Sequence, residues 1–132
     1  MIIGLIVQYC LGMAINVFVQ FPQNQGSGMN WQFATRNILI MAHLILGTLL
    51  IVGAIAQLVR VVRAKSAAWK LPAAYALVGV IVAWIGGDTF VTTQIAVLSY
   101  IMSLGFLVAI LSYFWGLYRS RAAETHGKPG RV

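Results

Sequence analysis

Charged residues are scarce in this sequence, and acidic ones are almost absent. Asp88 and Glu124 are the only two acids in 132 residues, of which 8% are charged and 61% hydrophobic. No paired carboxylates, Ser/His/Asp set, phosphate-binding glycine loop or metal-ligand cluster is present, so the sequence predicts no enzymatic activity. A composition this apolar excludes an ordinary soluble domain and predicts an integral membrane protein.

Cysteine is also nearly missing. Cys10 is the only one, which excludes an internal disulfide and a cysteine-based zinc or iron–sulfur site. Its neighbours are apolar, as is typical of a small packing residue.

The basic residues are segregated along the chain. Four Lys and Arg lie between Arg60 and Lys70, four lie between Arg119 and Arg131, and Arg36 stands alone. Basic residues beside membrane spans set the orientation and contact anionic lipid headgroups, so such headgroups are the expected partner. The basic segments are short and carry no recognition motif, so nucleic-acid binding is not expected.

Four apolar runs predict an all-α bundle of four transmembrane helices within residues 1–118. The expected spans are about 2–19, 37–59, 71–87 and 95–118, joined by a loop at 20–35, a basic turn at 60–70 and a tight turn at 88–94. Pro72 is expected in the first turn of the third span, and Thr92 or Thr93 at the start of the fourth. Residues 119–132 are a predicted basic tail.

The distribution of positive charge predicts the orientation. The basic turn and the tail carry eight of the nine basic residues, so both are expected in the cytoplasm, together with both termini. The protein is thus a predicted multi-pass protein of a bacterial plasma membrane. A span that begins at residue 2 also suggests that the native chain extends upstream. The similar ends of the first and third spans, NVFVQ and DTFVTTQ, are a weak sign of a duplicated helix pair, and chance among apolar residues is the favoured explanation.

The second span is predicted to have an inner and an outer face. Helical spacing places polar and small residues on one face and only aliphatic side chains on the other. The inner face is expected to hold Arg36, Ile40, His43, Gly47, Leu50, Ala54 and Gln57, and the outer face Ile38, Ile45, Leu49 and Val52. Stripes that permit close helix contact are expected at Gly79, Ala83 and Gly86 and at Ala96, Ser99 and Ser103. Gln8, Gly12 and Asn16 share one face of the first span.

Polar side chains inside spans are candidates for a functional site. Asn16, Arg36, Asp88 and Ser99 lie at a similar predicted depth in the outer half, with His43 somewhat deeper. Arg36 and Asp88 are expected to form an ion pair at the interface. Three interpretations stay open for this cluster: hydrogen bonding between helices, a ligand site, and a path for protons or ions.

The span AHLILGTLLIVGAIAQLVRVVR, with its H-x-x-x-G motif, resembles the His-bearing spans of four-helix haem proteins, including one half of haem A synthase. It also resembles a group of small bacterial four-helix membrane proteins. The resemblance implies that His43 ligates haem b and that Gly47 gives room for the porphyrin. The fourth span carries Ser99, Tyr100 and Met102 where such bundles have a second histidine. Five-coordinate haem, a His43/Met102 pair, a histidine from a partner chain and no haem therefore all stay open.

These features predict a small non-enzymatic membrane protein that serves as an accessory or structural subunit of a larger complex, or as a homo-oligomer. The expected partners are other membrane subunits or a second copy of the chain. The alternative is a haem- or quinone-binding electron-transfer protein that uses His43.

Overall fold

The structure is a computed structural model and consists of helices and short connections. It describes residues 1–21 and 27–126, with side chains described except at positions 27, 28 and 123–126. The helices are α1 (Ile2–Phe18), α2 (Ser27–Arg36), α3 (Ile38–Arg63), α4 (Ala67–Thr93) and α5 (Ala96–His126). The predicted all-α fold is therefore confirmed.

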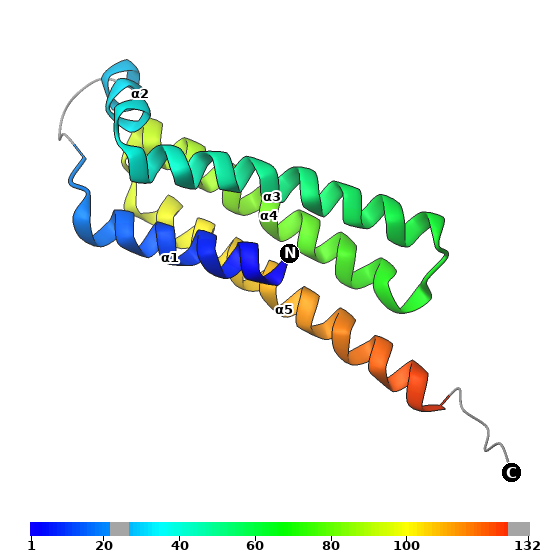
Figure 1. Cartoon of the computed structure of the whole chain (residues 1–132). Helices are drawn as coiled ribbons and strands as arrows, with labels where there is room; N and C mark the ends of the chain where they lie inside the picture. Colours follow the sequence, from blue (N-terminus) through cyan, green and yellow to red (C-terminus); the bar gives the residue numbers. More distant parts are fainter. Residues whose placement is uncertain (22–26, 127–132) are drawn as a thin grey trace, which may run out of the picture.

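Helices α1, α3, α4 and α5 form a bundle, and the short helix α2 covers one end of it (Figure 1). Each bundle helix packs on two neighbours, in the cyclic order α1, α3, α4, α5. The contact between α4 and α5 is the most extensive and that between α1 and α5 the thinnest. The short helix α2 rests on α3 and α4. The bundle is thus packed most closely between α4 and α5 and least closely between α1 and α5.

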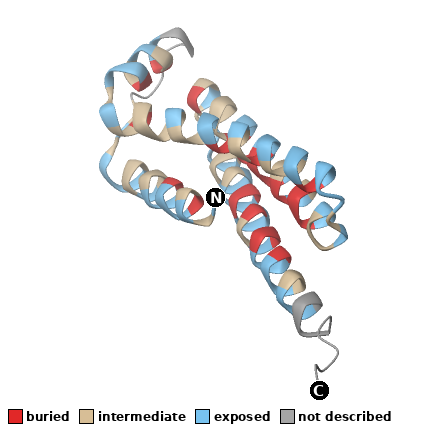
Figure 2. Ribbon diagram, turned by 45° about the vertical axis from the view of Figure 1, so that its right-hand side comes forward, coloured by how far each residue is buried: buried red, intermediate tan, exposed pale blue. Residues whose placement is uncertain are grey.

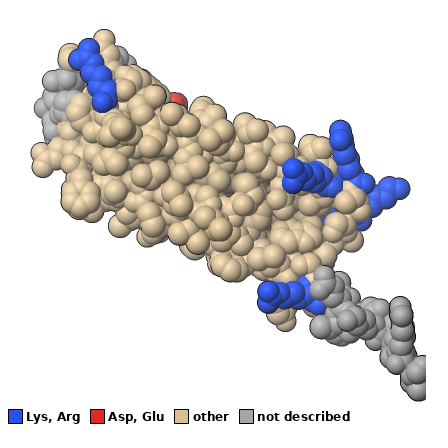
Figure 3. All heavy atoms as spheres, viewed as in Figure 1, with Lys and Arg blue, Asp and Glu red and all other residues tan. Residues whose placement is uncertain are grey.

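Three of these helices are long and apolar enough to cross a membrane. They are Ile38–Arg63, Ala67–Thr93 and the segment Ala96–Ala122 of α5. Helix α1 has 17 residues, which at 1.5 Å per residue is about 25 Å, against a hydrocarbon core of about 30 Å. Figure 3 shows Lys and Arg side chains near the two ends and a long surface without them between. This is the charge distribution of a membrane protein.

The two faces of α3 are as predicted. Ile40, Leu50 and Ala54 are buried, whereas Ile38 is 82% and Leu49 60% exposed. Helix α3 begins at the expected position because the Asn37 side chain caps it: Oδ1 accepts hydrogen bonds from the backbone N–H groups of Leu39 and Ile40 at 3.0 and 3.3 Å. Figure 2 shows buried residues concentrated where the bundle helices meet.

Close backbone packing joins α4 to α5. A Cβ atom built on Gly79 would lie 2.6 Å from the carbonyl oxygen of Gly105 and 2.9 Å from the amide nitrogen of Ala109. The small-residue stripe predicted on α4 is therefore a helix contact. The stripe predicted on α5 is wrong, because Ala96 and Ser103 are exposed and Gly105 and Ala109 take the contact instead.

The predicted limits of α4 are wrong at both ends. Residues 88–93 continue the helix, and the tight turn is confined to Gln94 and Ile95, where Gln94 has a φ of 57°. Thr92 and Thr93 both lie within α4, and α5 begins at Ala96, so neither stands at the start of α5 as predicted. The Thr93 hydroxyl donates to the carbonyl of Thr89 and accepts from the N–H of Ile95 at 3.5 Å. Helix α4 starts at Ala67, which places Pro72 inside it rather than in its first turn.

Two further segments are helical where the sequence predicted none. The expected loop at 20–35 contains α2, and α5 continues through the first part of the predicted tail to His126. Residues 127–132 of that tail lie outside the described residues. Helix α2 places Ala34 in a buried cluster with Ile40 and Val91, which ties it to the ends of α3 and α4.

Candidate functional site

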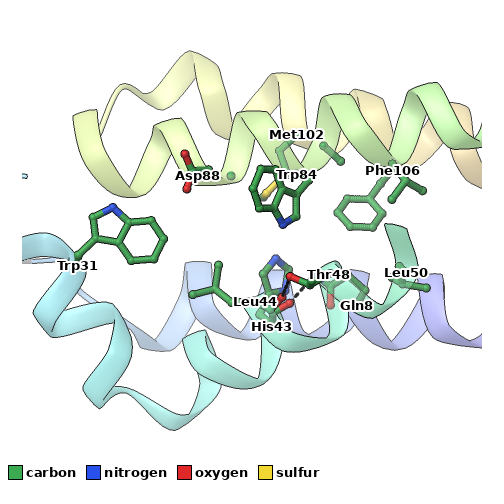
Figure 4. Close-up of a pocket in the computed structure, with 14 residues that line it drawn as sticks. Gln8, Trp31, His43, Leu44, Thr48, Leu50, Trp84, Asp88, Met102 and Phe106 are labelled. Atoms are coloured by element: carbon green, nitrogen blue, oxygen red, sulfur yellow. Dashed lines mark hydrogen bonds between the residues drawn. The ribbon is translucent and has the colours of Figure 1, made fainter. Parts of the chain in front are cut away.

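Three neighbouring cavities inside the bundle share His43 and Met102 in their walls. The largest has a volume of about 210 Å³, and the others have volumes of about 100 and 70 Å³. All four bundle helices contribute side chains to the largest one, and Trp31 of α2 borders the end nearest α2 (Figure 4). The bundle therefore contains unfilled space around His43 and Met102, toward the end that α2 covers.

Gln8 and His43 meet at this cavity and connect α1 to α3. The Gln8 side chain is 2% exposed, and its Nε2 donates a hydrogen bond of 2.9 Å to the backbone carbonyl of His43. The imidazole extends from α3 into the cavity toward Trp84 and Met102 in Figure 4. Residues four apart on a helix share a face, so Gly12 follows Gln8 on the side of α1 that meets His43.

The small residues around His43 make room for these two polar side chains. A Cβ atom on Gly12 would lie 3.1 Å from Cε1 of His43, and one on Gly47 would lie 3.0 Å from Nε2 of Gln8. The absence of a side chain at Gly12 thus leaves space for the imidazole, and its absence at Gly47 leaves space for the Gln8 amide.

Two buried polar atoms at the cavity have no hydrogen-bond partner among the described residues. They are Oε1 of Gln8 and Nδ1 of His43. An unsatisfied buried polar atom costs about 1–3 kcal/mol, and such atoms are rare in native structures. Their presence together at one cavity is the strongest sign that a polar group belongs there.

The wall around these atoms is apolar. Four residues of the main buried cluster of the bundle also line the largest cavity: Leu50, Val80, Ala83 and Phe106. Thr48 adds no free donor, because its hydroxyl donates to the carbonyl of Leu44 at 2.9 Å. A few polar groups in a mostly apolar wall are typical of small-molecule sites.

Aromatic residues gather at the end of the site beneath α2. The ring of Phe21 lies 5.6 Å from that of Phe33 and 5.7 Å from that of Phe90. Trp31 of α2 and Asp88 of α4 face the same end of the largest cavity in Figure 4. Helix α2 therefore covers this end of the cavity.

The structure brings most of the predicted site residues together. His43, Gly47, Met102 and Asp88 line the largest cavity, and Asn16 and Ser99 line both smaller ones. Two predictions are wrong. Tyr100 is 65% exposed and turned away from the interior. Arg36 is exposed at the end of α2, and in the described part of the chain it forms no ion pair with Asp88.

The sequence did not single out the contact between Gln8 and His43, or Trp84 as part of the cavity wall. The spacing of Gln8, Gly12 and Asn16 on one helix face was the available signal for the first. Trp84 follows the buried Ala83 on α4 and is itself 43% exposed, so periodicity alone assigns it to lipid.

The described residues do not fit haem. His43 is the one histidine whose side chain the structure describes, and no group of metal-binding side chains occurs in the described ranges. The space at Gly47 that a porphyrin would need is taken by the Gln8 amide. The largest cavity, about 210 Å³, is also below the lower limit of about 300 Å³ for sites of drug-sized molecules.

Comparisons with protein-family models, with curated proteins and with solved structures found no match to this chain. The function is therefore inferred from the geometry of the site.

Proposed function

We propose that this protein is a non-enzymatic membrane protein that binds a lipid-soluble small molecule, with the polar end of that molecule between Gln8 and His43. The observation that carries the proposal is the pair of buried, unpartnered atoms at one cavity, Oε1 of Gln8 and Nδ1 of His43. A ligand that supplies their hydrogen bonds removes an energetic cost that the protein otherwise bears.

The size of the cavity supports a small headgroup. An engineered protein cavity of about 150 Å³ accepts benzene, so a cavity of about 210 Å³ accommodates one six-membered ring. The thin contact between α1 and α5 offers a passage for an apolar tail, because the smallest cavity lies between these helices and is bordered by the half-exposed Tyr9 and Met13.

The proposal includes a fourth span and an orientation. Helix α1 packs along α3 and is apolar apart from a few residues such as Gln8 and Asn16, so it serves as a short fourth span that local thinning of the bilayer accommodates. The basic residues near the connection between α3 and α4 favour a cytoplasmic location for that end and for both termini. Helix α2 then lies on the outer side and covers the site.

An accessory or structural subunit is the second candidate. The sequence favours it through the absence of a soluble domain, the small number of polar groups and the small-residue stripes suited to helix contacts, among them Gly79, Ala83 and Gly86. This stripe packs on α5 of the same chain, so it gives no support for a partner. The subunit hypothesis stays a prediction, and it is compatible with a ligand in the bundle.

The test is to purify the protein from its native membrane in a mild detergent and to identify bound molecules. We expect mass spectrometry of an organic extract to find one lipid-soluble species enriched over the bulk lipid, and the visible spectrum to lack a Soret band. An extract with only bulk lipid would refute ligand binding. A Soret band that disappears in His43→Ala would replace the proposal with a haem protein.

A further inference from the structure

The orientation of the Gln8 amide specifies what the ligand must offer. Resting on the function proposed above, we propose that the site selects a ring that carries a hydroxyl group, such as a quinol, over the corresponding ring with only carbonyl oxygens. The selecting atom is Oε1 of Gln8, a buried acceptor without a donor in the described residues.

The assignment of the two amide atoms follows from the hydrogen bond to His43. A carbonyl oxygen only accepts, so the amide atom 2.9 Å from the His43 carbonyl must be the nitrogen. The other amide atom is then the oxygen, which also only accepts. A ligand can satisfy it with an O–H or N–H group, and a carbonyl oxygen in that place would be repelled.

The neighbouring polar groups do not reverse this preference. A neutral imidazole has one accepting and one donating nitrogen, so His43 can pair with a hydroxyl or with a carbonyl. The hydroxyl groups of Thr48 and Ser103 already donate to the carbonyls of Leu44 and Ser99.

The indole N–H groups of Trp31 and Trp84 in the same wall can donate to a hydroxyl or to a carbonyl oxygen. The Asp88 carboxylate accepts and so acts in the same direction as Gln8. Oε1 of Gln8 is the buried, unpartnered acceptor beside His43, so it is the atom on which we base the preference.

The position of Gln8 makes the preference strong. The side chain is 2% exposed and is held between Gly47 and the His43 carbonyl, so it cannot turn its oxygen toward solvent. Leaving a buried acceptor unpaired is unfavourable by an amount that corresponds to about tenfold to a hundredfold in affinity. We expect the hydroxyl form to bind more tightly by such a factor.

The experiment compares three probes on the purified full-length protein in detergent: decylubiquinol, decylubiquinone and the dimethyl ether of decylubiquinol. Affinities come from the shift in the thermal unfolding midpoint over a concentration series, because a ligand of the folded state raises that midpoint. The quinol is expected to bind at least about tenfold more tightly than the quinone and the ether, neither of which has a hydroxyl donor.

Two matched variants test whether Gln8 is responsible. Gln8→Leu is expected to bind the quinol and the quinone with equal affinity, whereas Gln57→Leu, the same change at a position outside the three cavities, is expected to keep the preference. If Gln8→Leu does not fold, the comparison of the three probes on the unchanged protein still decides.

The outcomes separate this inference from the proposed function. Equal binding of all three probes, or tighter binding of the quinone, would overturn the inference and leave a ligand site in place. Absence of binding by all three, together with an extract that contains only bulk lipid, would overturn both.

Discussion

Gly79 of α4 and Gly105 of α5 pack backbone against backbone: a Cβ atom built on either would lie 2.6 Å from the carbonyl oxygen of the other. Real Cβ atoms do not approach so closely, so both helices would have to move apart to accept any side chain. In a membrane, where water does not drive helices together, such close packing is a main source of association between helices.

The first prediction grades two glycines by the space around them. Gly79→Ala is expected to destabilise the bundle by about 1–3 kcal/mol, because it forces two backbones apart. Gly86→Ala is expected to cost less, since its Cβ would lie 3.2 Å from the nearest atom. Unfolding in a detergent series measures both. Leu49→Val, at a 60% exposed position, is the control, expected within about 0.5 kcal/mol of the unchanged protein. Equal effects at all three positions would contradict the close backbone packing of α4 on α5.

The second prediction concerns orientation. In a Cys10→Ala background, which removes the exposed native cysteine, Thr35→Cys on α2 is expected to react with a membrane-impermeant thiol reagent added to intact cells. Ala64→Cys, in the turn between α3 and α4, is expected to react only after lysis. Both positions are exposed, so access and not burial decides the result. The reverse pattern would invert the orientation.

The third prediction concerns Arg36 and Asp88. Since the two side chains form no ion pair in the described structure, the effects of Arg36→Gln and Asp88→Asn on the free energy of unfolding are expected to add to within about 0.5 kcal/mol. A double-mutant cycle in detergent measures this. A coupling of about 1 kcal/mol or more would restore the contact that the sequence predicted.

The fourth prediction uses the backbone at Lys65, which has a φ of 50° in the turn between α3 and α4. A non-glycine residue in this left-handed region costs about 1–2 kcal/mol, so Lys65→Gly is expected to stabilise the protein by up to about 1 kcal/mol. Ala64→Gly is the matched control. Ala64 has a φ of −73°, so glycine there brings no relief and is expected to be neutral or destabilising by about 0.5–1 kcal/mol. Stabilisation by both substitutions or by neither would contradict the left-handed conformation at Lys65 as a source of strain.

The sequence was sufficient for the helices that carry a clear pattern. The inner and outer faces of α3 follow from the spacing of Ile40, Leu50 and Ala54 against Ile38 and Leu49. The stripe on α4 followed from Gly79 and its neighbours, because small residues at helical spacing have few other uses in an apolar helix.

The sequence was insufficient where tertiary contacts override local signals. The turn predicted at 88–94 is largely helical, since α4 continues to Thr93. Gly86 and Gly87, which precede that segment, lie within α4 close to Leu98 and Met102 of α5, and this closeness favours glycine there. Helix α2 was missed because its segment is polar and short, and it is held by burial of Ala34 against Ile40 and Val91. Tyr100 was assigned to the site from its position in the chain, although its helix face is turned outward.

Several members of the candidate site could be predicted from the sequence, but their contacts could not. Polar residues in spans identified His43 and Asn16, since such residues are rare in spans without a role. Which atoms remain unpaired depends on the register between α1 and α3, and no local pattern gives that register. The hydrogen bond from Gln8 to His43 therefore had to come from the structure.

The most direct measurement of the central claim is native mass spectrometry of the protein released from native membrane. Gly87 lines two of the cavities, and a Cβ there would meet Met102 Sδ at 3.2 Å, so Gly87→Leu fills the space beside His43. Ala56→Leu makes a similar addition on an exposed face of α3. We expect one small lipid-soluble adduct per chain in the unchanged protein and in Ala56→Leu, and none in Gly87→Leu. An adduct retained in all three, or absent from all three, would contradict a ligand site at Gln8 and His43.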